Sequence, residues 1–310
     1  MNGLGGTDTA KGGDDRSLSV FDVNGVTKFQ LTIRDVPVDL ERIARSAQMF
    51  RWTPVGQSWR VHDGDHVHTV QSLGDGQFEV ESNQGETAFR LLIRLETDHA
   101  EMHQKLVKYG PEIEPFLANR EGLRMMRANS KTEVLFSFLC SSCNHVNRIT
   151  KMVWSLAARG ENGFPGIERL AEVTEQELRA EGFGYRGATI PKVAQILASN
   201  GGERYLDDLA NGSYEDARKE LISLPGVGKK LADCICLYAF DFGQSVPVDT
   251  HIWQVLTRLY YPTWVGTNLT DTKYETVAGH LRDRFGELAG VAHQFLFVDN
   301  MERYRSREIL

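Results

Sequence analysis

Apolar and polar residues alternate along the first third of the chain, and this pattern changes to a helical spacing near residue 98. The alternating runs are SLSVFDV, KFQLTI, SWRVHDG, HVHTVQSL, QFEVES and ETAFRLLIRL. Alternation at every second position is typical of half-buried strands, and turn residues such as Gly74-Asp75-Gly76 separate the runs. Residues 17–98 are therefore predicted to form an antiparallel sheet, interrupted by one helix near residues 39–48.

Beyond residue 98, apolar residues recur every three or four positions, which indicates amphipathic helices. The predicted helices cover residues 99–108, 111–119, 132–141, 144–158, 167–181, 188–199, 203–210 and 213–223. Thr174-x-x-Glu177 has the form of a capping box, and Ser213-x-x-Asp216 has a weaker form of it.

The two patterns predict an α+β fold with three segments. Residues 1–16 are rich in Gly and Asp without apolar periodicity, which is typical of a disordered tail. Residues 17–130 are predicted to form an N-terminal antiparallel sheet domain. Residues 131–310 are predicted to form an all-helical region of two lobes, with a helical hairpin near residues 213–240.

Composition narrows the class of protein. The chain has 310 residues, of which 41% are hydrophobic and 25% charged, as in ordinary globular proteins. No apolar run approaches a membrane span and no signal peptide is recognisable, so we expect no membrane association. The four cysteines, Cys140, Cys143, Cys234 and Cys236, form two close pairs rather than a secreted disulfide framework. They predict an intracellular protein with buried free thiols, because Cys140-x-x-Cys143 lacks a second ligand pair for zinc.

The net charge of −7 is unusual for a protein that binds nucleic acid. Residues 119–159, however, carry seven basic side chains and two acidic ones. The basic residues are Arg120, Arg124, Arg127, Lys131, Arg148, Lys151 and Arg159. A local basic face on an acidic protein is sufficient to bind phosphates, with an affinity that depends on salt.

The segment 221–253 carries the residues best suited to chemistry. Its L-P-G-V-G turn, with Pro225, Gly226 and Gly228, separates a helix that ends at the proline from one that begins at Lys229. Glycines allow positive φ and close approach of the backbone, and a helix start presents unpaired N–H groups to an anion. This is a helix–hairpin–helix, and its natural anion is a nucleic-acid phosphate.

The second helix of this hairpin places Lys230 and Cys234 on one face. The partial positive charge of a helix start disfavours an ammonium group, so a partly desolvated Lys230 would be a neutral nucleophile. In V-P-V-D-T-H, Asp249 stands at the N-cap of the next helix, with His251 in its first turn. Lys230 and Asp249 therefore form a candidate pair for covalent catalysis.

Three simpler interpretations remain open at this point. The hairpin could serve only as a sequence-independent grip on DNA, and Asp249 could act only as an N-cap. Lys229 and Asp233 are interpreted as an exposed i,i+4 ion pair, which contributes only a few tenths of a kcal/mol.

The sequence L-P-G-V-G-K-K-L-A-D-C-I-C-L followed by V-P-V-D-T-H resembles the signature of the helix–hairpin–helix (HhH-GPD) DNA glycosylase superfamily. Within it, the chain most resembles the 8-oxoguanine DNA glycosylase/AP lyases. The similarity runs from about residue 17 to about residue 303 and is densest at 133–150, 183–186 and 213–253. The resemblance implies that Lys230 is the Schiff-base lysine and Asp249 the conserved acid. It further implies excision of 8-oxoguanine from duplex DNA and nicking of the strand by β-elimination.

The resemblance also bears on cofactors, partners and location. It implies a structural K⁺ or Na⁺ held by the backbone carbonyls of Ile222, Leu224 and Val227, and no required cofactor. No cysteine follows Cys236, so the iron–sulfur cluster of some relatives is excluded. We expect a monomer that binds double-stranded DNA containing damaged guanine. Its location would be the cytoplasm and nucleoid of a prokaryote or the nucleus of a eukaryote.

The segment A-Q-M-F-R-W, residues 47–52, resembles the family's G-Q-S-F-R-W. The backbone carbonyl of the family's glycine reads the hydrogen on N7 that only the oxidised guanine carries. Ala47 keeps this carbonyl but adds a Cβ next to the base. Selectivity for the oxidised base is therefore expected at Ala47.

The other residues of the base pocket follow from A-G-V-A-H-Q-F-L-F, residues 289–297, which resembles A-G-W-A-Q-A-V-L-F. Phe297 is expected to stack on the flipped base opposite Cys234, with Phe138 in the same pocket; packing in the core is the alternative for Phe297. The family's glutamine reads the Watson–Crick edge of the base. Here that position is His293, with Gln294 one residue further on.

The residues expected to contact DNA are Asn144, Arg148, Tyr185, Arg186, Gly226, Gly228, Leu231 and His251. Residues 135–150 resemble L-F-S-F-I-C-S-S-N-N-N-I-x-R-I-T, in which the first Asn of the triplet and the Arg contact the cytosine left unpaired. The chain keeps Arg148 but has Cys143 in place of that Asn, and a thiol forms weaker hydrogen bonds. Discrimination of the opposite base is therefore predicted to be reduced.

The segment G-F-G-Y-R, residues 182–186, matches the family's G-L-G-Y-R. Tyr185 would be a wedge beside the gap in the duplex, and Arg186 a second reader of the unpaired base. An aromatic residue packed on a helix is the alternative for Tyr185. Two other functions remain as alternatives: a glycosylase of the same superfamily for another damaged base, because Ala47 and His293 deviate, and a non-catalytic DNA-binding protein.

Overall fold

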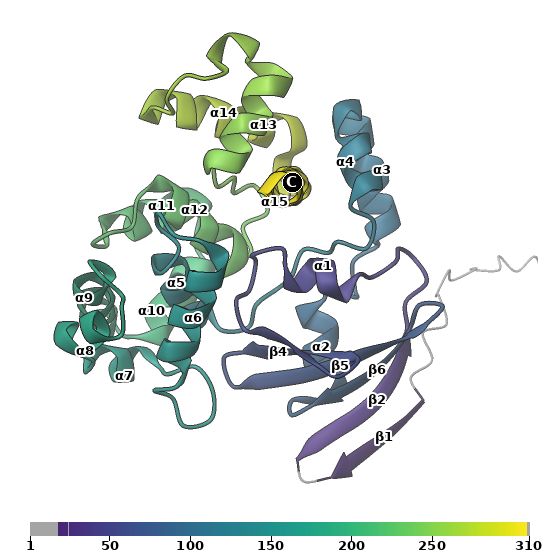
Figure 1. Ribbon diagram of the computed structural model, residues 1–310, viewed down its shortest axis with the longest axis vertical. Helices are drawn as coiled ribbons and strands as arrows, with labels where there is room; N and C mark the ends of the chain where they lie inside the picture. Colours follow the sequence, from purple (N-terminus) through teal and green to yellow (C-terminus); the bar gives the residue numbers. More distant parts are fainter. Residues whose placement is uncertain (1–17, 24, 309–310) are drawn as a thin grey trace, which may run out of the picture.

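The computed structural model describes residues 18–23 and 25–308, so the predicted tail at residues 1–16 lies outside them. An antiparallel six-stranded sheet, in the order β1-β2-β6-β5-β4-β3, forms the N-terminal part (Figure 1). The strands are β1 (Leu18–Val23), β2 (Val26–Thr32), β3 (Trp52–Val55), β4 (Ser58–Asp63), β5 (His66–Gly74) and β6 (Gln77–Ser82). The predicted antiparallel sheet is confirmed. Strand β3, an edge strand containing Pro54, was not predicted.

One predicted strand is wrong. Residues 86–95 do not extend the sheet, because residues Gly85–Leu92 form helix α2, which packs on β2 and β6. Phe89, Leu92 and Ile93 are the buried residues of this segment. Their spacing of three and four positions places them on one helical face. The segment therefore has a helical spacing of buried residues, which was not recognised because its many apolar residues also fit a strand.

Helix α1 lies between β2 and β3 in the chain, and the other helices follow the sheet and cover most of the predicted ranges. They are α1 (Leu40–Ala44), α3 (His99–Tyr109), α4 (Glu114–Asn119), α5 (Lys131–Leu139), α6 (Val146–Ala157), α7 (Ile167–Ala171), α8 (Glu175–Ala180), α9 (Arg186–Ser199), α10 (Glu203–Ala210), α11 (Tyr214–Ser223), α12 (Lys229–Tyr238), α13 (Thr250–Tyr260), α14 (Asp271–Phe285) and α15 (Ala289–Glu308). In the part of the chain that the structure describes, none is long and apolar enough to cross a membrane. The α+β fold class is confirmed.

The predicted helix at 167–181 is two helices, α7 and α8. Thr174 caps α8, with its hydroxyl accepting from the Glu177 amide and the Glu177 carboxylate accepting from the Thr174 amide. The predicted capping box is confirmed, and it interrupts the helical range because an N-cap residue takes extended backbone angles. Ser213 caps α11, accepting from the Asp216 amide at 3.1 Å.

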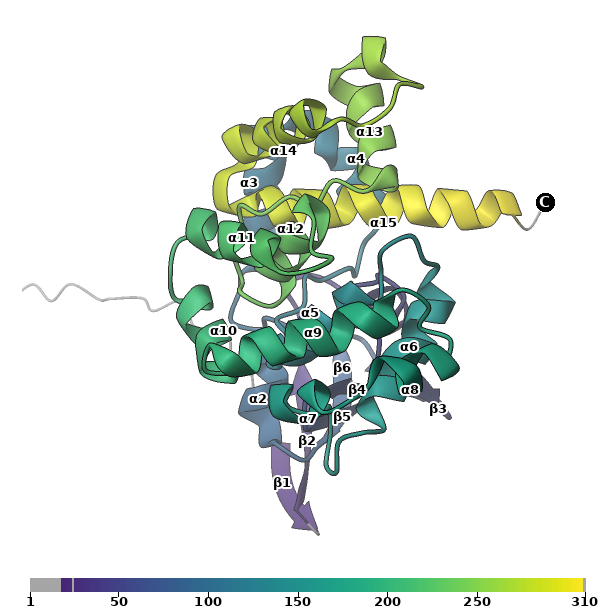
Figure 2. The ribbon, with the colours of Figure 1, turned by 90° about the vertical axis from the view of Figure 1, so that its left-hand side faces the viewer.

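Three apolar clusters fill the molecule. One lies under the sheet with α1 and α2, a second joins α5 to α12, and the third contains the C-terminal helices. Leu106, Ile113, Leu117 and Leu123 belong to the third cluster, so it crosses the boundary predicted at residue 130. Helix α15 runs between helices α13 and α14 on one side and helices α11 and α12 on the other (Figure 2). It thereby brings the C-terminal segment of the chain against α12.

Candidate active site

The start of α12 is open to an anion. Its N-cap is Gly228, which supplies no side-chain cap, so the N–H groups of Lys229, Lys230 and Leu231 have no partner within the helix. Gly226 has a φ of 75°, and a Cβ there would lie 2.7 Å from Thr189 Cγ2. The turn therefore needs glycine. The side chain of Leu231 is buried in the core, so a DNA contact at this residue is limited to its backbone.

Lys230 is half-buried at this helix start. Its Nζ lies 5.6 Å from the centre of the Phe138 ring and is hydrogen-bonded to the Cys234 thiol. Among the described residues it forms no ion pair with a carboxylate, whereas neighbouring Lys229 forms two. Burial raises the pKa of Cys234 to about 11, so this group stays a neutral thiol. The surroundings of the Lys230 amine are therefore largely apolar.

Asp249 is the N-cap of α13, where its Oδ1 accepts from the Ile252 amide at 2.9 Å. The carboxylate is only partly buried. Its charge acts on both Cys234 and His293, and so does the charge of Lys230. The starts of α12 and α13 thus bring the two predicted catalytic groups to the same pair of buried side chains.

Aromatic rings form the walls of this site. Phe138 stacks on Tyr238 at 5.3 Å between ring centres, and Phe297, which is half-buried, lies parallel to the His293 ring at 6.1 Å. Burial lowers the pKa of His293 to about 4, so its ring is neutral at physiological pH. The ring is hydrogen-bonded to the Pro247 carbonyl, while its buried Nδ1 has no partner. His293 therefore donates through Nε2 and keeps Nδ1 as an unused acceptor.

Gln294 does not face the site as a base reader. Its Nε2 donates to the Ser46 carbonyl at 3.1 Å, and its Oε1 accepts from the Tyr238 hydroxyl at 2.5 Å. Both polar ends of this side chain are thus engaged within the protein. The prediction that placed Gln294 among the base-contacting groups is corrected accordingly, because one residue along a helix turns the side chain by about 100°.

Ala47 lies in the loop before β3 with a φ of 59°. This left-handed conformation costs a residue with a Cβ roughly 1–2 kcal/mol. The chain therefore keeps the backbone geometry expected of the family's glycine although it lacks the glycine. Gln48 supports the loop by donating to the Ser46 hydroxyl and to the Arg124 carbonyl, each at 2.9 Å.

The turn between α5 and α6 carries the residues predicted to meet the unpaired base. Cys143 is exposed with a φ of 47°, whereas Cys140 is buried, so the prediction of buried thiols is wrong for Cys143. The Asn144 amide donates to the Cys140 carbonyl at 3.0 Å and so closes the turn. Arg148 is exposed and donates to the Gly182 carbonyl at 2.8 Å.

Tyr185 stands beside this turn. Its side chain is 56% exposed, and its hydroxyl donates to the Ser142 carbonyl at 3.1 Å. Arg186 is buried and also donates to that carbonyl, with its guanidinium 4.5 Å from the centre of the Tyr185 ring. Arg148 on α6 thus lies close to Tyr185 and Arg186 at the start of α9, because each side donates to a carbonyl of the other's loop, and the Tyr185 ring is exposed.

His251 occupies the first turn of α13. Its Nδ1 lies 3.1 Å from Nδ2 of Asn300. An amide nitrogen only donates, so Nδ1 accepts and the ring proton is on Nε2. The ring packs edge-on against Phe297 at 5.5 Å. His251 therefore keeps one N–H donor available at the start of a helix.

The predicted basic face at 119–159 is wrong. Five of its seven cations are paired with carboxylates: Arg120 with Asp299, Arg124 with Asp35, Arg127 with Asp241, Lys131 with Asp207, and Arg159 with Glu181. Arg148 and Lys151 are exposed and have no ion-pair partner among the described residues. These basic residues do not form an unpaired basic surface, because carboxylates from segments distant in sequence pair with most of them.

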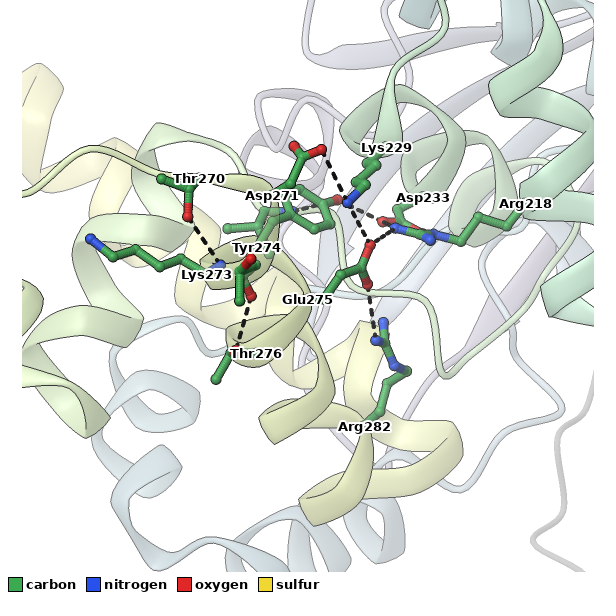
Figure 3. A network of polar contacts seen from close by, with 12 residues as sticks. Arg218, Lys229, Asp233, Thr270, Asp271, Lys273, Tyr274, Glu275, Thr276 and Arg282 are labelled. Atoms are coloured by element: carbon green, nitrogen blue, oxygen red, sulfur yellow. Dashed lines mark hydrogen bonds and ion pairs between the residues drawn. The ribbon is translucent and has the colours of Figure 1, made fainter.

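The sequence also misassigned Asp233. It is fully buried and does not pair with Lys229. Instead, it accepts from Arg218 Nε at 2.7 Å and from the Tyr274 hydroxyl at 2.6 Å (Figure 3). It also accepts from the Tyr214 hydroxyl at 2.7 Å. Lys229 pairs with Asp271 and Glu275 on α14. This network ties both hairpin helices, α11 and α12, to α14.

The hairpin also holds the carbonyls predicted to bind a monovalent cation. Helix α11 ends at Ser223, so the carbonyls of Ile222 and Leu224 stand where helical partners run out. The Leu224 carbonyl accepts from the Val227 amide at 3.1 Å, which closes the turn. Neutral oxygen donors of this kind suit K⁺ or Na⁺. No group of three metal-binding side chains occurs within the described part of the chain.

Comparison with known proteins assigns this arrangement to a family. Residues 136–278 match the model of the HhH-GPD superfamily base excision DNA repair proteins. The chain is 31% identical over 290 residues to the N-glycosylase/DNA lyase OGG1 of Arabidopsis thaliana, covering 87% of this chain and 79% of the plant protein. The chain belongs to the N-glycosylase/DNA lyase family. Membership in this family excludes the alternative of a non-catalytic hairpin protein.

Solved structures agree with this family assignment. The structure of MBOgg1 in complex with a low-affinity DNA ligand has a TM-score of 0.79 and 25% identity, covering 92% of this chain and 99% of that one. The Clostridium acetobutylicum 8-oxoguanine glycosylase/lyase, in complex with double-stranded DNA containing cytosine opposite 8-oxoG, has a TM-score of 0.78 and 24% identity. The match covers 92% of this chain and 98% of the Clostridium chain, and it supports the fold described above.

Proposed function

We propose that this protein removes 8-oxoguanine from duplex DNA and then cleaves the strand as an AP lyase. The observation that carries the proposal is that Lys230 and Asp249, from two helix starts, both act on Cys234 and His293, with the Phe138 ring centre 5.6 Å from the Lys230 amine. An uncompensated amine beside a partly solvated carboxylate suits covalent catalysis at a sugar carbon. The relatives named N-glycosylase/DNA lyase support both halves of the activity.

In the first chemical step, the neutral amine of Lys230 attacks C1′ of the extruded nucleotide. The C1′–N9 bond breaks as the C1′–Nζ bond forms, and its electron pair leaves with the base. The proton that the amine loses goes to the departing base. Asp249 stabilises the positive charge that develops on the sugar during this exchange.

The second step cleaves the strand. The sugar ring opens as the C1′–O4′ bond breaks. Its electron pair stays on O4′, which takes a proton from water, and the Nζ lone pair of Lys230 forms a protonated Schiff base with C1′. This cation acidifies C2′, which loses a proton to a base, and the 3′ phosphate leaves with the C3′–O bond pair. The product is a nick on the 3′ side of the lesion, with the lysine released by hydrolysis of the Schiff base.

Selectivity for the base would rest on two hydrogen-bond acceptors and on two side chains that contact the faces of the base. The Ala47 carbonyl would accept from the N7 hydrogen of 8-oxoguanine. His293 Nδ1, an unpartnered acceptor, suits the N1–H and amino donors on the guanine edge and not the N1 acceptor of adenine. Phe297 and Cys234 would hold the two faces of the base. Unpaired buried acceptors strengthen such discrimination, because a base without the matching donors leaves them unsatisfied.

Contacts with the phosphates would come from the two helix starts. The free N–H groups at the start of α12, after Gly228, and the Nε2–H of His251 are donors suited to phosphate oxygens. A K⁺ or Na⁺ on the carbonyls of Ile222, Leu224 and Val227 would add positive charge at the hairpin. This cation would hold the turn and take no part in the chemistry.

The α5–α6 turn and the adjoining start of α9 would occupy the gap in the duplex. Exposed Tyr185 suits the wedge, and Arg148 with Arg186 suits contact with the unpaired base. Cys143 offers that base only a weak hydrogen-bonding group, so discrimination of cytosine is reduced. A protein with this task works as a monomer where the genome lies, in the cytoplasm and nucleoid of a prokaryote or in the nucleus of a eukaryote.

Borohydride trapping tests the proposal. Incubation with a duplex containing 8-oxoguanine opposite cytosine should give a covalent protein–DNA adduct, and Lys230→Gln should abolish it. Lys229→Gln is the matched control, because this neighbouring amine pairs with acidic side chains, and the adduct should persist. Base release without an adduct would indicate a monofunctional glycosylase. An adduct that persists in Lys230→Gln would refute the assignment of the nucleophile.

A further inference from the structure

Two positions at which the chain departs from the family motif meet in the structure. Ala47 stands where the family has glycine, and Gln294 stands where it has alanine. Gln294 on α15 reaches the residue before Ala47, since its Nε2 donates to the Ser46 carbonyl across a sequence separation of 248 residues. The two departures are therefore coupled by one hydrogen bond.

The bond acts on the backbone angle that is unusual at Ala47. The Ser46 carbonyl belongs to the peptide plane that precedes Ala47, and φ of Ala47 is the rotation of its Cα relative to that plane. This φ is 59°, in the region that a Cβ disfavours. A donor fixed on the Ser46 carbonyl opposes rotation back to an ordinary negative φ.

The donor itself is held firmly. Gln294 is 1% exposed, and its Oε1 accepts from the Tyr238 hydroxyl. This contact orients the amide, because the hydroxyl donor requires the carbonyl end and leaves the NH₂ for Ser46. Burial keeps the pKa of Tyr238 well above its usual value, so the hydroxyl remains a donor. Tyr238 lies on α12, the helix that carries Lys230.

We propose that Gln294 is a positioning residue that holds the Ser46–Ala47 peptide in the left-handed geometry required to present the Ala47 carbonyl to the oxidised base. The inference rests on the proposed function. It assigns Gln294 to base selection and not to the chemistry at the sugar. Substrates without a base should therefore be insensitive to its removal.

Single-turnover rates on two duplexes test this. One contains 8-oxoguanine opposite cytosine, and the other contains an abasic site at the same position. Gln294→Met, which keeps the length of the side chain but has no N–H to donate to Ser46, should slow 8-oxoguanine release about tenfold or more. Cleavage of the abasic site should change by less than about twofold. Tyr238→Phe removes the hydroxyl that orients the Gln294 amide but leaves the amide itself. It should therefore cause a smaller decrease in the rate of 8-oxoguanine release.

The decisive variant combines Ala47→Gly with Gln294→Ala. Glycine takes a φ of 59° without a Cβ, so this pair should recover most of the rate that Gln294→Ala loses. Gln195→Ala is the matched control, because Gln195 also donates to a backbone carbonyl, that of Ala171, but at the exposed surface. It should leave both rates unchanged.

Two outcomes overturn the inference. Equal losses on both duplexes would mean that Gln294 is only structural, and failure of the double variant to recover would remove the link to Ala47. Failure of the proposed function is seen separately, as a wild-type protein that cleaves the abasic duplex but releases no 8-oxoguanine. Melting temperatures of all variants show whether each remains folded.

Discussion

Asp233 offers the sharpest test of how the hairpin is held. The change is Asp233→Asn, which preserves the shape of the side chain and removes its charge. Four hydrogen bonds reach this carboxylate: from Tyr214 at 2.7 Å, from Arg218 at 2.7 and 3.3 Å, and from Tyr274 at 2.6 Å. An amide offers one acceptor oxygen and turns a donor toward the remaining donors.

The expected loss follows from these contacts. Removing one partner of a buried ion pair costs about 3–5 kcal/mol because the other charge stays buried. Arg218 keeps a second partner, Glu275, at 2.9 Å, and the Glu275 side chain is 39% exposed. The lower end, about 3 kcal/mol, is therefore expected. For a chain of 310 residues that lowers the melting temperature by roughly 5 °C.

Thermal and urea unfolding of the protein without DNA measure this loss. Glu275→Gln is the control, since an exposed partner contributes less than about 1 kcal/mol. Because α12 also carries Lys230, Asp233→Asn should slow adduct formation as well. A variant that unfolds within about 1 kcal/mol of the wild type would refute the claim that this network holds the hairpin to α14.

Three further predictions follow from other buried or exposed groups. Burial lowers the pKa of His68 from 6.5 to about 4. The unfolded chain therefore binds a proton at this residue at a higher pH than the folded chain does. The contribution of His68 to the free energy of unfolding is highest above pH 6.5 and falls by about 3 kcal/mol as the pH drops toward 4. His68→Leu should reduce this loss in unfolding measured across that range, and an unaltered pH profile would contradict the assignment. Arg51→Met should lower the free energy of unfolding in urea by about 3–5 kcal/mol, because Arg51 binds buried Glu133 at 2.6 and 2.5 Å. The double variant Arg51→Met with Glu133→Leu should recover most of this stability. No recovery would exclude the ion pair as the cause of the loss. The wild type should excise 8-oxoguanine opposite C and opposite A at comparable rates, and Cys143→Asn should raise the preference for C about tenfold; a hundred-fold preference in the wild type would refute the role given to Cys143.

The sequence determined the features that depend on neighbours within one turn. The capping box at Thr174 and Glu177 and the N-cap at Asp249 were readable because donor and acceptor lie three residues apart. The glycine turn of the hairpin was readable because the φ of 75° at Gly226 is a local backbone demand that glycine meets without strain. Family motifs added which of these local features carry the chemistry.

Local patterns failed where the partner is remote. The apolar run at 86–95 suits a strand by composition, and only its packing on β2 and β6 selects the helical face of Phe89, Leu92 and Ile93. The cations of 119–159 were counted as a surface, although Arg124 is buried against Asp35 across 89 residues. Sequence spacing carries no information about such distances.

Tertiary structure alone decided the surroundings of the active site. It placed Asp233 where it accepts a hydrogen bond from Tyr274, 41 residues away, and it left Lys230 without a carboxylate partner among the described residues. It also turned Gln294 from the base to the Ser46 carbonyl. The physical reason is that a side chain's charge state and hydrogen bonds depend on which groups share its low-dielectric surroundings. The sequence named the groups that can react, and the packing of the helices decided which of them remain free to do so.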